Sequence, residues 1–191
     1  MNKAKSKACF LDRDGVVIEE KNYLATIEDI VIFNETYEAL KLLRANGFKI
    51  IVVTNQGGVA RGYYNENAVN AVHKEIDRKL SLKDLSIDAY YYCLHHPEGK
   101  VEKYSIECDC RKPAPGMLLQ AVKDFDIDLS KTFMIGDKMS DVKAAENAGC
   151  LGILVTTGHG KKHQDKALRK GVIVKENILE AVKYCLEAKN I

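Results

Sequence analysis

Short apolar runs alternate along the chain with longer segments in which apolar residues recur at the spacing of one helical face. The runs are continuously apolar rather than interleaved with polar residues, which is typical of parallel strands covered on both faces. The pattern predicts strands at residues 8–11, 49–54, 89–93, 132–135, 152–156 and 172–174. It predicts helices at residues 35–46, 66–80, 140–149 and 176–188, with a further helix opened by Pro115.

This alternation of strand and helix predicts an α/β fold, a doubly wound, mostly parallel, Rossmann-like sheet with helices on both faces. Residues 1–191 are expected to form one domain, and the gaps after Asp14 and Thr54 are too short for a separate cap domain. Ligands of such sheets bind at the carboxyl ends of the strands. Asp12, Thr54 and Asp137 all stand at the ends of predicted strands, so we expect them to converge on one rim.

The tetrapeptide Asp12-Arg13-Asp14-Gly15 follows the first predicted strand. A carboxylate at the end of a buried strand must be paired, protonated or bound to a metal. A hard cation and a phosphoryl group would use this pair, with one Asp as nucleophile and the other as acid and base. The alternative interpretation is a polar turn, because Asp-Gly is common turn chemistry.

Three later segments strengthen the phosphoryl-transfer interpretation. Thr54 offers a hydroxyl at a strand end, and the loop beyond it offers backbone N–H groups for phosphate oxygens, although this is also ordinary loop composition. Arg111 and Lys112 precede a predicted helix and suit an anion site, the alternative being an exposed basic turn. Asp137 could complete a magnesium shell, and Asp141 could support that shell or favour the helix start.

Composition places few further limits on function. Hydrophobic residues make up 46% of the chain and charged residues 29%, and the net charge is +2, which gives no general electrostatic reason to bind nucleic acid. No apolar stretch suits a membrane span or a signal-peptide core, so we expect a cytoplasmic protein. The basic stretch 161–170 is expected to be a solvated loop and helix face. Cys9, Cys150 and Cys185 stand in apolar settings and are expected in the core.

A second group of residues has metal-ligand spacing. Cys93 and His95, followed by Cys108 and Cys110, supply three thiolates and an imidazole, a common structural zinc set. His96 is the competing ligand, and the alternative is that the cysteines are unrelated buried residues. We expect zinc to hold the loop 93–110 that leads into the Arg-Lys pair.

The chemical motifs occur in a fixed order along the chain: Asp12-x-Asp14-Gly15, Thr54, Lys112 and Gly136-Asp137-x-x-x-Asp141. This order resembles the haloacid dehalogenase-type phosphatases over nearly the whole predicted domain. The resemblance implies that one Asp of the first motif is a nucleophile that forms an aspartyl-phosphate, and that the chain is a phosphatase rather than a dehalogenase.

The resemblance also implies a role for each motif residue. Asp12 would be the nucleophile, and Asp14 would protonate the leaving alkoxide and then deprotonate water. Thr54 and Lys112 would hold the phosphoryl oxygens. Magnesium would be bound by Asp12, the backbone carbonyl of Asp14 and Asp137.

The zinc loop leading into Arg-Lys-Pro resembles one branch, the D-glycero-D-manno-heptose 1,7-bisphosphate 7-phosphatase family, whereas the related histidinol-phosphate phosphatases have a shorter stretch there. The residues that this resemblance places against the sugar or its distal phosphate are Asn22, Tyr23, Asn55, Arg111 and Lys138. Two positions depart from the branch pattern, Leu94 where Pro is usual and Gly57 where Ser is common.

The activity implied is magnesium-dependent removal of the 7-phosphate in the synthesis of nucleotide-activated heptose for lipopolysaccharide or other surface glycans. The implied partner is a small sugar phosphate, and we expect a monomer that binds neither nucleic acid nor membrane. The alternatives are a histidinol-phosphate phosphatase, a broader small sugar-phosphate phosphatase, and a non-enzymatic, zinc-stapled binding module.

Overall fold

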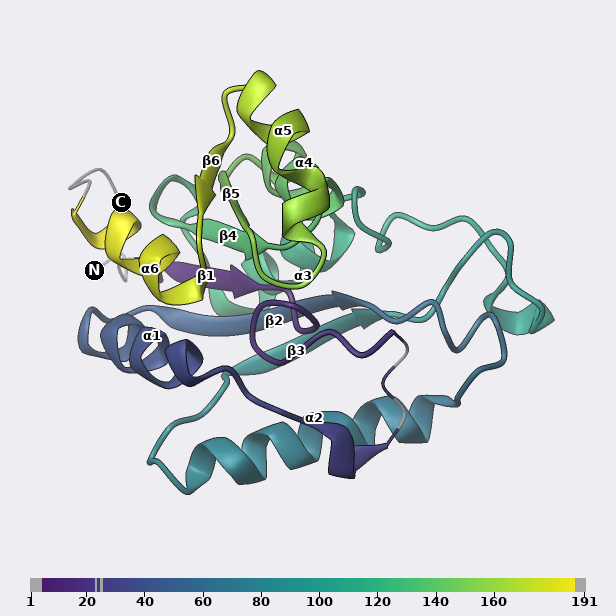
Figure 1. Cartoon of the computed structure of the whole chain (residues 1–191). Coiled ribbons are helices and arrows are strands. Elements are labelled where there is room, and N and C mark those ends of the chain that lie inside the picture. The colour runs from purple at the N-terminus through teal and green to yellow at the C-terminus, as the bar shows by residue number, and fades with distance from the viewer. Residues whose placement is uncertain (1–4, 23, 25, 188–191) are drawn as a thin grey trace.

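The computed structural model describes residues 5–22, 24 and 26–187, and it has the predicted alternation of strands and helices. In chain order the elements are β1 (Ala8–Leu11), α1 (Asn34–Ala45), β2 (Lys49–Asn55), α2 (Glu66–Ser81), β3 (Ala89–Cys93), α3 (Gly116–Phe125), β4 (Phe133–Gly136), α4 (Met139–Ala148), β5 (Leu151–Val155), α5 (Gly160–Arg169), β6 (Ile173–Lys175) and α6 (Ile178–Glu187). The strands form one sheet in the order β3-β2-β1-β4-β5-β6, and neighbouring strands pair in parallel (Figure 1).

Helices cover both faces of this sheet, which explains why the strands are apolar throughout. Cys9 and Leu11 of β1 pack into a core with α1, α2 and α6. Ala8 and Phe10, which point to the opposite face, pack with α3 and α4. Because each strand buries both sets of side chains, no polar position interrupts its pattern.

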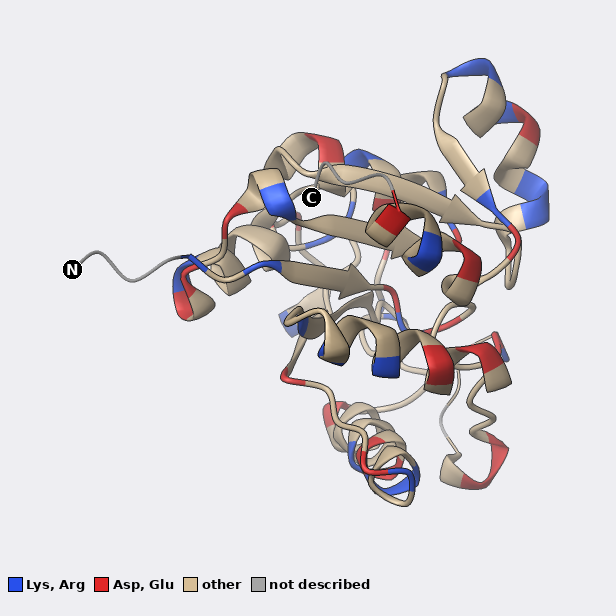
Figure 2. Ribbon diagram, turned by 90° about the vertical axis from the view of Figure 1, so that its left-hand side faces the viewer, with Lys and Arg blue, Asp and Glu red and all other residues tan. Residues whose placement is uncertain are grey.

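Local signals set several element ends. The Asn65 side chain accepts a hydrogen bond from Ala68 N–H at 3.0 Å and caps the start of α2. Gly149 ends α4 with a φ of 93°, a left-handed conformation that glycine adopts readily. The stretch 161–170, expected as a solvated loop and helix face, forms α5, a helix of 10 residues with several basic side chains (Figure 2).

The connections beyond the carboxyl ends of β1, β2 and β3 are loops rather than a separate unit. Among the described residues, the connection between β1 and α1 contains only one short 3₁₀ turn, Ile27–Asp29, and the long connection between β3 and α3 contains another, Glu102–Tyr104. In the described part of the chain, these connections are therefore loops with short 3₁₀ turns. No helix within the described ranges has both the length and the apolar composition needed to cross a bilayer.

Candidate active site

A cleft of about 380 Å³ lies at the carboxyl edge of the sheet. Its walls come from the end of β2, from the start of α4 and from the loops that follow β1, β2, β3, β4 and β5. The predicted residues Asp12, Asp14, Thr54 and Lys112 all line it. The convergence expected from the strand ends is thus present in the structure.

Asp12 lies on the floor of this cleft, immediately after β1. Its side chain is buried, with Oδ1 3.0 Å from Lys112 Nζ and 2.8 Å from the Arg13 backbone nitrogen, whose N–H it accepts. Burial alone would raise the pKa of Asp12, but the charges of Lys112 and Lys138 outweigh burial and hold this pKa below its usual value. Asp12 is therefore ionised, which is the state that a nucleophile needs.

Lys112 is a buried cation held between two carboxylates. Nζ lies 3.0 Å from Asp12 and 2.7 Å from Asp141 Oδ1, and it donates to the Val53 carbonyl at 2.7 Å. Burial alone would lower the pKa of Lys112, but the two carboxylates outweigh burial and hold this pKa above its usual value. The Asn55 side chain bonds both the N–H and the C=O of Lys112, each at 3.0 Å. Asn55 thus fixes the Lys112 backbone to the end of β2, and its sugar contact stays a prediction.

Asp137 and Asp141 bring further negative charge to the same place. Asp137 is fully buried; Oδ2 accepts the His159 N–H at 2.8 Å, whereas Oδ1 accepts no hydrogen bond and lies 3.4 Å from Lys138 Nζ. Burial, followed by the charge of Asp12, raises the pKa of Asp137 to about 7. Asp141 Oδ2 accepts the Lys138 N–H at 2.9 Å at the start of α4. Asp141 therefore both orders the helix start and pairs with the buried lysine.

These buried carboxylates fit a magnesium ion. Oxygens of Asp12, Asp137 and Asp141 all lie within 4.8 Å of one another. The ammonium groups of Lys112 and Lys138 leave three such carboxylates with excess negative charge, and the Asp137 oxygen that accepts no hydrogen bond is one that a hard cation would satisfy. Gly15, with a φ of 83°, lets the preceding turn press against Asp137, because a Cβ at Gly15 would lie 2.5 Å from Asp137 Oδ2.

Gln56 joins the carboxylate of Asp14 to the end of β2. Its Nε2 donates to Asp14 Oδ2 at 2.9 Å and to Thr54 Oγ1 at 2.8 Å, and its Oε1 accepts from the Tyr64 hydroxyl at 2.8 Å. Because Thr54 Oγ1 is the acceptor of this bond, its own hydrogen can point toward a phosphoryl oxygen. Sequence reasoning assigned no role to Gln56, and its place beside Thr54 was the only signal.

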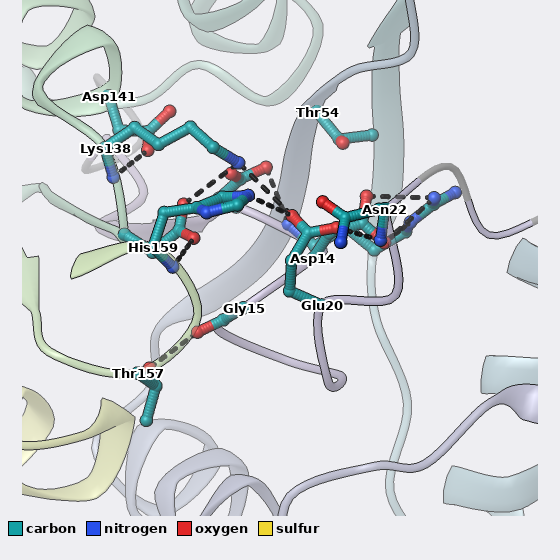
Figure 3. A network of polar contacts seen from close by, with 12 residues as sticks. Asp14, Gly15, Glu20, Asn22, Thr54, Lys138, Asp141, Thr157 and His159 are labelled. Atoms are coloured by element: carbon teal, nitrogen blue, oxygen red, sulfur yellow. Dashed lines mark hydrogen bonds and ion pairs between the residues drawn. The ribbon is translucent and has the colours of Figure 1, made fainter. Parts of the chain in front are cut away.

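One side of the rim carries Lys138, another predicted residue. Glu20 Oε2 lies 3.4 Å from Lys138 Nζ and 3.3 Å from His159 Nε2 (Figure 3). Burial lowers the pKa of Lys138, but neighbouring carboxylates raise it well above its usual value, so the group is a cation. Asn22 lines the cleft and donates its backbone N–H to Glu20 at 2.8 Å. Tyr23 lies outside the described residues.

The other side of the rim carries Arg61, His96 and Arg111. Arg111 Nη1 donates to the His95 carbonyl at 3.1 Å. His96 Nδ1 accepts the Glu98 N–H at 3.1 Å, and His96 Nε2 lies 3.0 Å from Arg61 Nη2, which is also 4.0 Å from Glu98 Oε2. Burial, followed by the charges of Arg111 and Arg61, lowers the pKa of His96, which favours the neutral ring. Two arginines therefore line this side of the cleft, and their positive charge favours a bound anion. Sequence reasoning assigned no contact to Arg61.

The four predicted zinc ligands come together behind Arg111. Cys110 Sγ lies 3.2 Å from the sulfurs of both Cys93 and Cys108, these two are 3.6 Å apart, and His95 Nδ1 is 3.5 Å from Cys110 Sγ. The sulfurs of one tetrahedral zinc ion would be about 3.8 Å apart, so the residues fit this metal with little movement.

The zinc loop is also attached to the loop that carries Arg61. The Ala60 carbonyl accepts the N–H groups of Lys100 and Val101 at 2.7 Å and 2.9 Å. The loop that follows β3 therefore supports the loop that follows β2, in addition to carrying Arg111 directly.

The sequence and the fold both have close counterparts among known proteins. A family model described as HAD-hydrolase-like matches residues 109–181. A D-glycero-beta-D-manno-heptose-1,7-bisphosphate 7-phosphatase from Pasteurella multocida is 42% identical over 168 residues, which cover 85% of this chain and 91% of the relative. The chain belongs to the heptose 1,7-bisphosphate 7-phosphatase family of haloacid dehalogenase (HAD)-like hydrolases. The family member from Photorhabdus laumondii, named for the alpha anomer, is 43% identical over 162 residues, 83% of this chain and 87% of the relative.

A solved structure of the same family supports this assignment. The D,D-heptose 1,7-bisphosphate phosphatase of B. bronchiseptica, complexed with magnesium and phosphate, has a TM-score of 0.83 at 30% identity and covers 96% of this chain and 99% of its own. The predicted family, the Rossmann-like parallel fold and the enzyme class, a phosphoric monoester hydrolase, are thereby confirmed. HAD phosphatases use magnesium, which agrees with the carboxylate cluster.

Both departures from the family pattern fit their surroundings. Leu94 is buried in a small apolar cluster with Val59 and Val69. A Cβ at Gly57 would lie 3.1 Å from Arg111 Nη1 and 3.2 Å from His96 Cδ2, so the glycine lets these two side chains pack against the loop.

A buried histidine that sequence reasoning did not assign lies behind the first motif of this phosphatase. His73 Nε2 is 3.3 Å from Arg13 Nη1, and the ring stacks on Tyr90 with centroids 4.3 Å apart and planes at 16°. Burial, and then the charge of Arg13, lower the pKa of His73 to about 3. His73 is therefore neutral, and its Nε2 accepts from Arg13, because a guanidinium has no acceptor.

This neutral histidine predicts a pH dependence of stability. As the pH falls below about 6.5, the unfolded chain binds a proton at His73, whereas the folded protein does not. The free energy of unfolding is therefore unaffected by this group above about pH 6.5 and decreases as the pH drops toward 3. We expect the wild type to lose about 2 kcal/mol more than His73→Gln in free energy of unfolding between about pH 6 and pH 4. Urea unfolding at several pH values measures both slopes, and equal slopes would contradict a neutral His73.

Proposed function

We propose that this protein removes the 7-phosphate of D-glycero-D-manno-heptose 1,7-bisphosphate through an aspartyl-phosphate at Asp12. The observation that carries the proposal is an ionised, buried Asp12 beside Lys112, at the floor of a cleft with cations on two sides of its rim. Relatives bearing this activity in their names cover most of the chain at 42–43% identity.

In the first step, an Asp12 carboxylate oxygen attacks phosphorus, and the bond from phosphorus to the sugar oxygen breaks. Asp14 donates a proton to that oxygen as it leaves. Lys112, the Thr54 hydroxyl and the backbone N–H groups after β2 hold the phosphoryl oxygens. In the second step, Asp14 takes a proton from water as the water attacks phosphorus, and the bond to Asp12 breaks.

Magnesium, which we propose is bound by Asp12, the Asp14 carbonyl and Asp137, supplies the positive charge that lets an anionic nucleophile approach a phosphate dianion. Asp141 acts through Lys112, with which it is ion-paired. Asp14 carries out both proton transfers, and the hydrogen bond from Gln56 holds its carboxylate in place.

The distal phosphate would bind between the two cationic sides of the rim. Arg111 and Lys138 are the predicted contacts, and we add Arg61, because its guanidinium lines the same side of the cleft as Arg111. Asn22, Tyr23 and Asn55 remain proposed sugar contacts. A bisphosphate thus matches a site with one anion position at the carboxylates and a second at the rim.

The proposal extends to the zinc loop and to the setting of the enzyme. Zinc bound by Cys93, His95, Cys108 and Cys110 would hold residues 93–110 and so place Arg111 and Lys112. Residues 1–191 would work as one phosphatase domain in a cytoplasmic monomer, with a product that enters nucleotide-activated heptose synthesis. A net charge of +2 agrees with a protein that binds neither nucleic acid nor membrane.

Phosphate release by the purified protein with magnesium tests the substrate. The panel contains the alpha and beta anomers of heptose 1,7-bisphosphate, histidinol phosphate and simple sugar monophosphates. We expect kcat/KM for one heptose bisphosphate to exceed that for every monophosphate by about 100-fold, because the distal phosphate adds charged contacts. A preference for histidinol phosphate would replace the substrate and keep the mechanism, whereas no turnover of any compound would refute the proposal.

A further inference from the structure

Arg13, the residue between the two aspartates of the first motif, is a buried cation with every side-chain nitrogen in contact with a partner. Nε lies 3.2 Å from Asp14 Oδ1, and Nη2 lies 3.1 Å and 2.9 Å from the two carboxylate oxygens. Nη1 points the other way, to His73 at 3.3 Å. The side chain is only 1% exposed, so these protein partners, and not water, set the orientation of the guanidinium.

The orientation of His73 is itself fixed by two tyrosines of β3. The ring stacks on Tyr90, and Tyr92 lies against it with centroids 5.4 Å apart. The Tyr90 hydroxyl donates to Asp77 at 2.7 Å, which ties this tyrosine back to α2, the helix that carries His73. A stacked, neutral ring on a helix is a rigid acceptor, and it aims Nη1 of the guanidinium in one direction.

We propose that His73 is a positioning residue for proton transfer, which it controls by fixing Arg13 and thereby the Asp14 carboxylate. This inference rests on the proposed role of Asp14 as acid and base. Without an acceptor at position 73, Nη1 becomes a buried donor with no partner, and the guanidinium turns to recover one. Asp14 then keeps its bond to Gln56 but loses the paired contacts that set its plane.

The dependence of rate on the leaving group separates this role from general support of the fold. A sugar alkoxide needs a proton as it leaves, whereas p-nitrophenolate leaves without one. The value of kcat/KM reports the first phosphoryl transfer, in which Asp14 acts as acid. His73→Phe keeps the stacking surface and removes the acceptor, while His73→Gln keeps a carbonyl oxygen that can accept from Arg13.

We expect His73→Phe to lower kcat/KM by about tenfold for a sugar phosphate and by less than about threefold for p-nitrophenyl phosphate at neutral pH, with His73→Gln close to the wild type on both substrates. Equal losses on the two substrates, no loss, or His73→Gln as defective as His73→Phe would overturn the proposal. If His73→Phe fails to fold, His73→Leu gives the same comparison, and thermal unfolding of each variant identifies a folding defect.

Asp14→Asn is the reference that distinguishes the two proposals. If Asp14→Asn loses far more activity on the sugar phosphate than on p-nitrophenyl phosphate but His73→Phe does not, Asp14 is the acid and the role of His73 is wrong. If Asp14→Asn itself shows no dependence on the leaving group, the proposed acid role fails, and the inference about His73 fails with it.

Discussion

Asp12→Asn is expected to abolish phosphate release while the fold remains intact. The amide has the size of the carboxylate but lacks the charge to attack phosphorus, so we expect a loss of at least about 10⁴-fold in kcat. Lys112 keeps its contact with Asp141 at 2.7 Å, and one of three clustered buried carboxylates is removed. The melting temperature should therefore stay within a few degrees of the wild type.

The measurement is phosphate release with magnesium, together with thermal unfolding of both proteins. Asp165→Asn makes the same chemical change at an exposed position of α5 and should be fully active. Mass spectrometry before and after the assay excludes deamidation back to Asp. Turnover by intact Asp12→Asn would rule out Asp12 as the nucleophile.

Cys108→Ala is expected to lower both stability and activity, because it opens the four-residue zinc site. We expect the melting temperature to fall by about 10 °C, since a structural metal binds the folded state only. Activity should fall by at least about tenfold, because Cys110 of the same site immediately precedes Arg111 and Lys112. No group that touches the reacting phosphate is removed, so the loss in activity reports on positioning.

Cys150→Ala is the matched control, because Cys150 is a partly buried thiol outside the cluster and packs against α3 and α4. Elemental analysis should find zinc in the wild type and in Cys150→Ala but not in Cys108→Ala. A zinc-selective chelator should lower the melting temperature of the wild type and leave that of Cys108→Ala unchanged. A stable and active Cys108→Ala would contradict the structural role of zinc.

The sheet could be predicted because its strands are buried on both faces and its polar motifs stand at their ends. Boundaries moved by a residue or two, as where β2 continues through Asn55. Helix α5 was not predicted as such because its burial rests on little more than Gly160 and Ala167, which leaves no apolar stripe to detect. Tertiary packing, rather than local pattern, decides such an element.

The residues of the candidate site also differ in whether a local sequence pattern marks them. The contact of Asp12 with Lys112 and the clustering of Cys93, His95, Cys108 and Cys110 could be predicted, because the spacing of these residues is itself the chemical signal. His73 could not, because it belongs to the helical stripe of α2 beside Val72, where a core residue is expected. Its partner Arg13 lies 60 positions away in sequence, so only the fold brings the two together. Roles that depend on a contact between distant segments leave no local pattern.

The bonds from Lys100 and Val101 to the Ala60 carbonyl join two loops that are distant in sequence. A substitution within the zinc loop can therefore shift the guanidinium of Arg61 without touching it. The carboxylates and Lys112 are anchored separately, by the strand ends and by Asn55. Because the two parts are anchored separately, the loop after β2 and the zinc loop can change during evolution without disturbing the carboxylates and Lys112. Selection for another phosphorylated metabolite can therefore alter substrate recognition while the phosphoryl-transfer chemistry is kept.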